Sequence, residues 1–301
     1  MLWISIPILL LIFFLLEALL RIHYIFKTPF LFMERDGVFY RYKPNQHKYQ
    51  LDNLRNLGKP NIPKITIYDE GIRSPITKKS PFYFKDSIIC LGCSITEGGG
   101  LIEEDTYPGK LQKLMPDHDV VNAGISGYGL PHELEMLKRL IKYKPKIVVL
   151  QLFGFARTKY AKPKKDSIIP KIYFTALYFY PILSLFKKEK TLEEKRKMNE
   201  KNQKELWKIN QPYLNDIRDI CKKNKIKLIM FVWPSWFWNA DYFHEQTKKY
   251  CEKNHIDTFD LRNMFSFYNK DEITIKNDSH PNPKCNHLVA KVTCNCIKGI
   301  K

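Results

Sequence analysis

One serine in the chain stands where an enzymatic nucleophile would be expected. It belongs to the stretch Ile88-Ile89-Cys90-Leu91-Gly92-Cys93-Ser94-Ile95-Thr96-Glu97-Gly98, in which an apolar run ends abruptly in a turn of small residues. Such a run is typical of a buried strand, and Gly92 and Gly98 allow the tight backbone that lifts a hydroxyl off the carboxyl edge of a sheet. Ser94 is therefore the candidate nucleophile.

A serine hydroxyl is a weak nucleophile at neutral pH, so this interpretation requires a base elsewhere in the chain. The segment Asn277-Asp278-Ser279-His280-Pro281-Asn282 puts an acid and an imidazole side by side near the C-terminus. In a serine-histidine-acid triad the imidazole takes the hydroxyl proton, and the acid holds the imidazole in the right tautomer. We expect His280 to be the base and Asp278 to be the acid.

The elements that must position these residues alternate between strand and helix patterns. Strands are predicted at Ser87–Leu91, Asp119–Asn122, Lys146–Phe153, Ile226–Trp233 and Ile256–Asp260. Helices are predicted after the Asp105-Thr106 cap, from Pro131, over about Leu192–Lys222, over 241–254 and from Pro283. This order predicts an α/β domain whose parallel sheet carries helices on both faces. Because ligands bind at the carboxyl ends of such strands, one cleft can gather both segments.

The N-terminus carries a predicted membrane span. Residues 2–22 are almost wholly apolar, and as a helix they would extend about 31 Å, which matches a hydrocarbon core of about 30 Å. A cleaved signal peptide is the alternative, but neither a basic start nor a small-residue cleavage site precedes Arg21. Basic residues follow the span at Arg21, Lys27, Arg35, Arg41 and Lys43, and none precedes it. The positive-inside rule alone would therefore keep the large domain in the cytoplasm.

We expect a transmembrane helix at 1–23, a basic juxtamembrane arm at 24–85 and a large domain at 86–301. The large domain would contain an insertion at 157–200. The arm is interrupted by prolines, with short strands predicted at Val38–Tyr42 and Ile65–Tyr68. It would lie over the domain, with its cationic face on lipid headgroups or in solvent. Within the insertion, the aromatic stretch Ile169–Phe186 fits a lid, a substrate-facing wall, a membrane-dipping segment or a core helix.

Composition excludes some classes of function. The net charge of +19 comes from lysines spread along the whole chain without a nucleic-acid recognition motif, so we expect no nucleic-acid partner. Seven cysteines, none before Cys90, make no small-domain disulfide framework and are expected to be buried free thiols. Cys294 and Cys296, near Cys285 and His287, raise the question of a metal. Being two apart on a helix, they point to different sides, so neither a metal nor a cofactor is expected.

Several blocks together resemble one family, the SGNH (GDSL-type) hydrolases, and in particular bacterial members with an N-terminal membrane helix. The resemblance covers roughly residues 69–298, through Asp69–Arg73, Gly92–Ser94, Asn122–Gly129 and Asp278–Asn282. It implies a flavodoxin-like three-layer αβα fold with Ser94 as nucleophile and His280 as base. The family acid is often three residues before the histidine, where this chain has Asn277. Members with the closer spacing look similar to this chain, and on that basis Asp278 is assigned as the acid.

The resemblance also implies an oxyanion hole with three donors: the N–H groups of Ser94 and Gly124, and an asparagine side chain after the third strand. Here Phe155 stands at the asparagine position. Removing one donor costs on the order of 10²–10³ in rate, so another group would have to substitute, with Arg157 and Asn239 as candidates. Asn122 and Arg157 are expected to contact substrate.

A second departure from the family lies next to the nucleophile. Where the family has aspartate immediately before the serine, this chain has Cys93. That aspartate supports the turn, so its loss is expected to loosen the loop. Cys93 itself is disfavoured as the nucleophile, because adjacent residues in a turn point in different directions.

These features predict a membrane-anchored serine esterase that removes an acyl group, such as acetyl, from a glycan or a related envelope polymer. Because similar anchored proteins commonly act on envelope or secreted glycans, the domain is expected on the extracytoplasmic side. One alternative is an acyltransferase of the same fold, in which a sugar hydroxyl resolves the acyl-enzyme. Another is a degenerate, non-catalytic member that binds acylated glycan or a partner protein.

Overall fold

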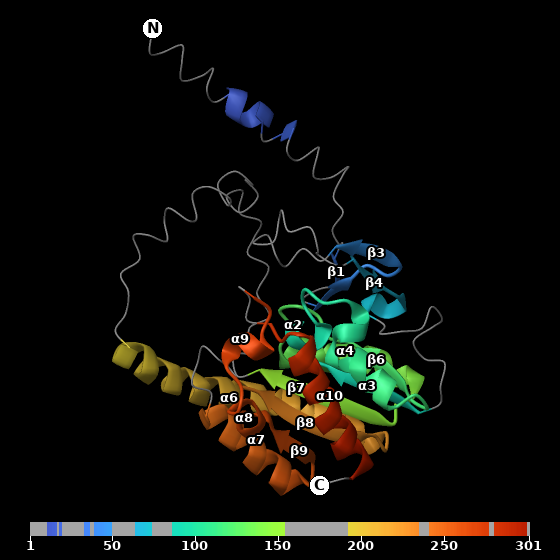
Figure 1. The fold of residues 1–301 in the computed structure, drawn as a ribbon, viewed down its shortest axis with the longest axis vertical. Helices are drawn as coiled ribbons and strands as arrows, with labels where there is room; N and C mark the ends of the chain where they lie inside the picture. Colours follow the sequence, from blue (N-terminus) through green and yellow to red (C-terminus); the bar gives the residue numbers. More distant parts are fainter. Residues whose placement is uncertain are drawn as a thin grey trace.

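The computed structural model describes residues 11–16, 18, 19, 33–36, 39–49, 64–73, 86–153, 192–234, 241–276 and 280–299 (Figure 1). The other residues include most of the predicted insertion and residues 277–279, among them Asp278. Their predicted roles lie outside the described part of the chain.

A parallel sheet of five strands forms the centre of the domain. Its strands, in spatial order, are β6 (Asp119–Asn122), β5 (Ser87–Leu91), β7 (Ile147–Phe153), β8 (Lys227–Trp233) and β9 (Asp257–Asp260). All neighbouring pairs are parallel. The predicted strands are confirmed to within one residue at each end. After β5 the chain forms β6 on one side of β5, and it then crosses to the other side, where β7, β8 and β9 follow in order. This switch point beside β5 is where open α/β sheets bind ligands.

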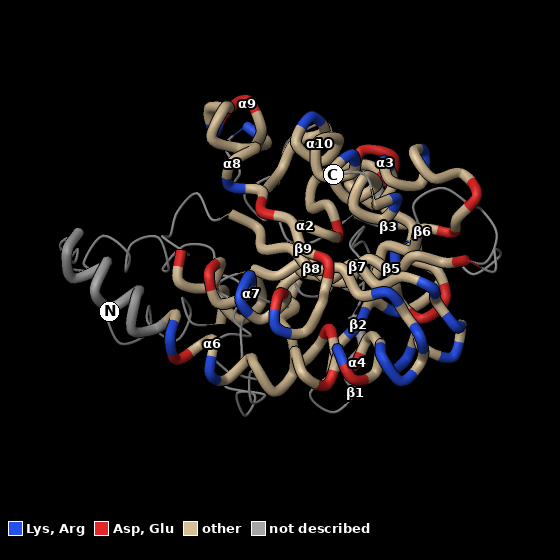
Figure 2. The backbone as a smooth tube through the Cα atoms, turned by 90° about the horizontal axis from the view of Figure 1, so that it is seen from below, with Lys and Arg blue, Asp and Glu red and all other residues tan. Residues whose placement is uncertain are grey.

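Helices cover both faces of the sheet, as predicted (Figure 2). One face carries α4 (Leu130–Leu140), α6 (Leu192–Lys223) and α7 (Asp241–Asn254), and the other carries α3 (Tyr107–Leu114), α8 (Leu261–Phe265) and α10 (Pro283–Lys298). Two one-turn helices complete the domain, α2 (Ser94–Glu97) and α9 (Lys270–Ile273). Alternation explains the two cores: Ile89 and Leu91 of β5 pack on the α4 side, whereas Ile88 and Cys90 pack on the α3 side.

Two helix starts that frame the site follow local sequence signals. Thr106 caps α3 by accepting a hydrogen bond from the Gly109 N–H at 3.1 Å. Asn282 caps α10 in the same way, accepting from the Cys285 N–H at 3.0 Å, and Pro283 follows it. Such caps satisfy backbone donors that have no partner within the helix. The positions of both helices were therefore predictable from a few adjacent residues.

The described residues of the arm before the domain form four short strands. β1 (Met33–Asp36) pairs antiparallel with β2 (Phe39–Tyr42), and β3 (Gln46–Tyr49) pairs antiparallel with β4 (Lys64–Ile67). Its apolar side chains are buried in the core that also contains α4; they are Phe39, Tyr42, Ile65, Ile67 and Ile72. The described part of the arm is therefore integral to the domain core rather than a solvated linker.

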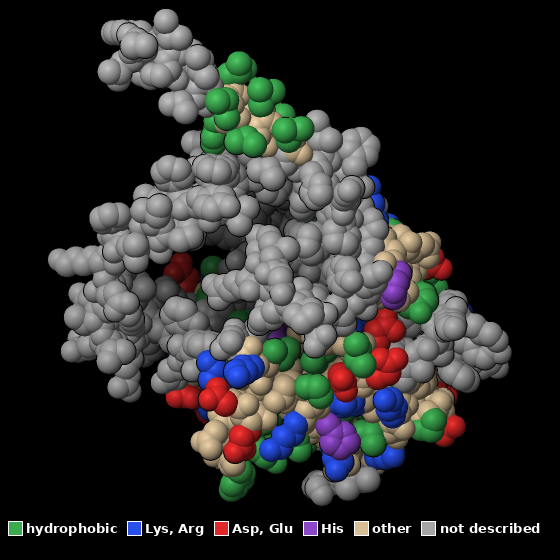
Figure 3. Space-filling view, turned by 45° about the horizontal axis from the view of Figure 1, so that its top comes forward, with side chains coloured by type: hydrophobic (Ala, Val, Ile, Leu, Met, Phe, Trp, Pro, Cys, Tyr) green, Lys and Arg blue, Asp and Glu red, His purple; other side chains and the backbone are tan. Residues whose placement is uncertain are grey.

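Only part of the predicted membrane segment is described. Residues 11–16, 18 and 19 are helical, and their apolar side chains, including Phe14 and Leu19 at 61% exposure, are mostly open to solvent (Figure 3). Among the described residues, no helix combines the length and the apolar character that a bilayer crossing requires. The rest of 2–22 lies outside the described residues.

Candidate active site

Ser94 and His280 meet at the carboxyl edge of the sheet. Ser94 begins α2 directly after β5, and its Oγ lies 2.9 Å from Nε2 of His280, which is 186 residues away in sequence. Both side chains are partly exposed, so a ligand can reach them. For the hydroxyl to donate to Nε2, the imidazole must carry its proton on Nδ1. This is the geometry that general-base activation of a serine requires.

A short antiparallel ladder between α9 and α10 holds His280. The Ile275 N–H donates to the His280 carbonyl at 2.9 Å, and the Asn282 N–H donates to the Ile273 carbonyl at 3.0 Å. The Asn282 amide also donates to the carbonyls of Glu272 and Thr274, at 2.8 and 3.3 Å. Asn282 therefore fixes both the start of α10 and the backbone on which the imidazole is mounted.

The glycine turn after α2 forms one wall of the site. A Cβ added to Gly99 would lie 3.5–3.8 Å from the His280 ring, so this backbone packs directly against the imidazole. Gly98 has φ of 80°, in the left-handed region, and its N–H donates to the Ser94 carbonyl at 3.0 Å. The turn thus connects the serine to the packing surface of the histidine.

Gln151, near the carboxyl end of β7, holds the serine turn through hydrogen bonds. Its Oε1 accepts hydrogen bonds from the Cys93 N–H at 3.4 Å, from the Cys93 thiol at 3.4 Å and from the Thr96 hydroxyl at 3.2 Å. Gly92 leaves room for this arrangement, because an added Cβ would lie 2.2 Å from the Thr96 hydroxyl oxygen and 2.7 Å from the Gln151 oxygen. The turn was expected to be loosened by the absence of an aspartate at position 93. Instead, it has a buried acceptor from another strand, which the local sequence pattern could not indicate.

Cys93 is poorly suited to be the nucleophile. Its side chain is buried, and burial raises the pKa of the thiol to about 12, so the thiol stays protonated at neutral pH. Thiolate, not thiol, is the reactive form. Burial and protonation both favour the partly exposed Ser94.

The loop after β6 packs tightly on α2. A Cβ on Gly124 would lie 2.4 Å from the Glu97 nitrogen, so only glycine allows this approach. Asn122 is completely buried; its Oδ1 accepts from the Gly124 N–H at 3.1 Å and its Nδ2 donates to the Glu97 carbonyl at 3.3 Å. The substrate contact expected of Asn122 stays a prediction, and to make it the amide would have to exchange one of these two bonds.

The donors predicted for an oxyanion differ in availability. Ser94 is the first residue of α2, so its N–H has no acceptor within the helix. The Gly124 N–H is bonded to Asn122, and its oxyanion role stays a prediction. Phe155, Arg157 and Asn239 lie outside the described residues, as does the predicted acid Asp278.

Sequence reasoning missed two side chains that hold the turn after Ser94. Arg73, fully buried, donates to carbonyls of residues 97–101, and the Tyr42 hydroxyl donates to the Glu97 carboxylate at 2.6 Å. Burial lowers the pKa of Arg73, whereas the neighbouring carboxyls of Glu103 and Glu97 raise it. Arg73 was one of the residues carrying the family resemblance, but no local signal indicated which loop it binds.

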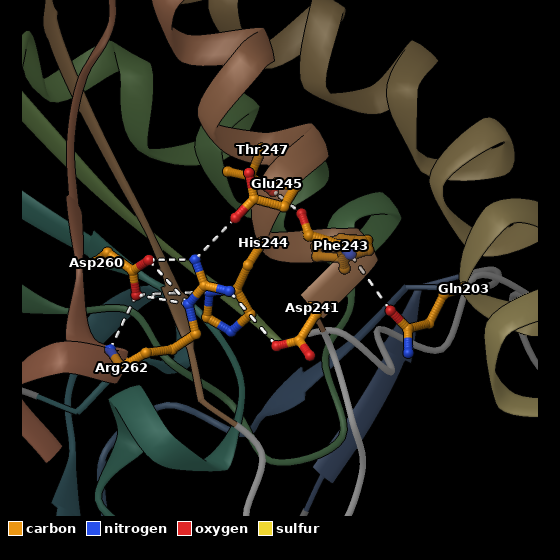
Figure 4. A network of polar contacts seen from close by, with 8 residues as sticks. All are labelled: Gln203, Asp241, Phe243, His244, Glu245, Thr247, Asp260 and Arg262. Atoms are coloured by element: carbon orange, nitrogen blue, oxygen red, sulfur yellow. Dashed lines mark hydrogen bonds and ion pairs between the residues drawn. The ribbon is translucent and has the colours of Figure 1, made fainter. Parts of the chain in front are cut away.

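A second polar cluster lies at the carboxyl end of β9 (Figure 4). Arg262 donates to Asp260 and Glu245, and it forms a longer ion pair with Asp241 at 3.5 Å. Burial, and secondarily the Arg262 charge, lower the pKa of the adjacent His244 to about 4, so this histidine is neutral at pH 7. The charges are paired with one another. The cluster therefore joins α7 and α8 to the edge strand.

No family model matches the sequence, and no curated protein matches it. Several solved structures are similar in fold. A psychrotrophic esterase, EstA, from a Pseudoalteromonas species is 16% identical, with a TM-score of 0.47 over 71% of this chain and 97% of its own. TesA is 15% identical, with a TM-score of 0.49 over 72% and 100%. A member of the lipolytic G-D-S-L family from Veillonella parvula is 14% identical, with a TM-score of 0.44 over 68% and 94%. The reaction proposed below rests on the geometry of Ser94 and His280, not on these similarities.

The support given by Gln151 can be tested by removing its amide. Gln151→Leu removes the buried oxygen that accepts from the Cys93 N–H and from the Thr96 hydroxyl, which should lower the free energy of unfolding by about 1–3 kcal/mol in urea denaturation. Gln246→Leu is the control, because Gln246 is half-buried on α7 and its side chain makes no hydrogen bond within the described part of the chain. That control should change stability by no more than about 0.5 kcal/mol. Equal stabilities of the two variants would contradict the role of Gln151.

Proposed function

We propose that the protein is a serine-dependent acyl ester hydrolase in which Ser94 is the nucleophile and His280 the general base. The observation that carries the proposal is the 2.9 Å contact between Ser94 Oγ and His280 Nε2. Its position at the switch point of the sheet, where parallel folds bind ligands, supports the same conclusion. Asp278 is the proposed acid that orients the imidazole.

In the proposed reaction, Ser94 Oγ bonds to the acyl carbon while its proton moves to His280 Nε2. The carbonyl oxygen becomes an oxyanion, to which the Ser94 N–H can donate. Return of the proton from Nε2 to the departing alcohol oxygen leaves an ester on Ser94. Water then bonds to the acyl carbon while one of its protons moves to His280 Nε2. The bond between the acyl carbon and Ser94 Oγ breaks, the proton passes from Nε2 to Oγ, and the free acid leaves.

The second oxyanion donor limits the expected rate. For the Gly124 N–H to take this role, it must exchange its bond with Asn122 Oδ1 for one with the substrate oxygen. Each absent donor costs about 2.7–4 kcal/mol of transition-state stabilisation. We therefore expect a slow esterase unless substrate binding moves Asn122 or Arg157 supplies a donor.

The proposed substrate is an acylated glycan or another ester of the cell envelope, as the resemblance to anchored SGNH hydrolases implies. Acyl transfer uses the same acyl-serine, with a sugar hydroxyl in place of water. A non-catalytic binding role is the second candidate. The bond between Gly124 and Asn122 favours it, because that bond occupies one predicted oxyanion donor.

We also propose that residues 2–22 anchor the protein in a membrane with the domain on the extracytoplasmic side. The almost wholly apolar sequence supports an anchor, and so does the exposure of the apolar side chains in the described residues 11–16, 18 and 19. Exposed apolar surface of this kind is unfavourable in water and favourable in lipid.

Hydrolysis of p-nitrophenyl acetate tests the proposed chemistry. Ser94→Ala and His280→Ala should each lower kcat/KM on the order of 10³-fold or more, because nucleophile and base act as a unit. Cys93→Ala should keep most of the activity, since the Cys93 thiol is buried and protonated. Loss of activity in Cys93→Ala but not in Ser94→Ala would refute the assignment. A wild-type protein that hydrolyses no acyl ester would favour the binding role.

Alkaline carbonate extraction tests the anchor. The full chain should stay in the membrane pellet, because this wash removes surface-bound proteins but not helices that cross the bilayer. A variant lacking residues 1–23 should appear in the supernatant. Release of the full chain would contradict the anchor.

For topology, a thiol added at the C-terminus of a cysteine-free version should react with an impermeant maleimide in intact cells; reaction only after lysis would place the domain in the cytoplasm.

A further inference from the structure

Residues 97–101 follow the candidate nucleophile Ser94 in the sequence and pack in space against the candidate base His280. We call this segment the 97–101 loop. The N–H groups of Gly98 and Gly99 both donate to the Ser94 carbonyl, at 3.0 and 3.1 Å. Gly99 also packs against the ring of His280. Any displacement of the 97–101 loop therefore changes the serine turn and the surface that supports the imidazole together.

Arg73 binds this loop through three carbonyl groups. Its Nη1 donates to the carbonyls of Glu97 and Gly98, at 2.8 and 3.2 Å, and its Nη2 donates to the carbonyl of Leu101 at 2.5 Å. The last carbonyls of a short helix have no N–H partner within that helix, so they accept hydrogen bonds from groups outside it. A guanidinium supplies several donors in one rigid plane, which suits a tight group of carbonyls better than a lysine ammonium does.

Tyr42 binds the same loop through its side chain. The Tyr42 hydroxyl donates to Glu97 Oε1 at 2.6 Å, and neither residue is more than 4% exposed. Glu97 is thus held at its carboxylate by Tyr42 and at its carbonyl by Arg73. A short, buried hydrogen bond to a carboxylate is among the stronger neutral-donor interactions in a protein.

Both side chains come from the arm that precedes the sheet domain. Tyr42 ends β2, and Arg73 follows β4 and forms a bridge with Asn122 at the end of β6. Tyr40, also on β2, donates to the Ser126 carbonyl at 3.2 Å, in the loop that contains Gly124. The arm therefore contacts two loops at the carboxyl edge of the sheet, the 97–101 loop and the loop after β6.

From these contacts we infer that Tyr42 and Arg73 are positioning residues of the site: they hold the 97–101 loop so that Ser94 and His280 keep their reactive geometry. The kinetic part of this inference rests on the proposed hydrolase function, whereas the structural part does not. The arm then acts as a component of the active site rather than only as the connection to a membrane.

Steady-state kinetics of Tyr42→Phe test the kinetic part. The variant keeps the ring and loses only the hydroxyl bonded to Glu97, so it should fold. Displacements of about 1 Å at a reacting centre cost up to about 10²-fold, so kcat should fall roughly 10- to 100-fold while KM changes less than about twofold. Arg73→Lys, which keeps the charge but not the planar fork, should show the same split.

Tyr250→Phe is the matched control. It removes a hydroxyl that bonds Asn215 at 2.9 Å, between α7 and α6 and away from the site. This variant should keep wild-type kcat. If Tyr42→Phe also keeps wild-type kcat in an active enzyme, or if the control loses as much, the positioning role is wrong.

Hydrogen exchange measured by mass spectrometry tests the structural part without any need for activity. Amides of residues 98–101 should exchange at least about tenfold faster in Tyr42→Phe than in the wild type, and should be unchanged in Tyr250→Phe. Unchanged exchange in Tyr42→Phe would overturn the inference. If exchange accelerates while the wild type hydrolyses no ester, the hydrolase function fails and the structural role of Tyr42 stands.

Discussion

The site depends on one hydrogen bond, between a hydroxyl that follows β5 and an imidazole that precedes α10. Neither partner is held by its own neighbours in sequence alone. The serine turn is supported by Gln151 from β7, and the histidine by the ladder that Asn282 completes. The loop between them is bound by Arg73 from the arm. A change in any of these supports is expected to alter the distance on which proton transfer depends.

The buried donors next to Ser94, on Cys93 and Thr96, share one neutral acceptor, the Gln151 amide oxygen. Gln151 offers an amide oxygen where an aspartate at position 93 would offer a carboxylate, and the Cys93 thiol beside it stays protonated. A neutral acceptor avoids the large desolvation cost of a buried carboxylate that has no counter-charge. The buried charge of Arg73 lies on the other side of the turn, where carbonyl oxygens and the carboxyls of Glu97 and Glu103 surround it.

Local patterns were sufficient to predict the strands and the helix starts, because each depends on a few adjacent residues. The contact between Ser94 and His280, which are 186 positions apart, was expected from several sequence blocks taken together. The contacts made by Gln151, Arg73 and Tyr42 were not predictable in the same way. Each joins residues more than 20 positions apart, and which loop a buried side chain reaches is decided only by tertiary packing. The substrate contact of Asn122 stays a prediction; its buried amide is bonded to the Gly124 N–H and to the Glu97 carbonyl. Asp278 and Arg157 lie outside the described residues, and so does Phe155, which stands at the oxyanion asparagine position. The roles of Asp278 and Arg157 stay predictions.

The central claim is that His280 makes Ser94 nucleophilic, and covalent labelling tests it most directly. A fluorophosphonate forms a stable adduct only with an activated nucleophile that has at least part of an oxyanion hole. After reaction, peptide mass spectrometry should find the phosphonyl mass on Ser94 in the wild type, and little or none after His280→Ala. An adduct on any other residue, or no adduct on the folded wild-type protein, would contradict this account.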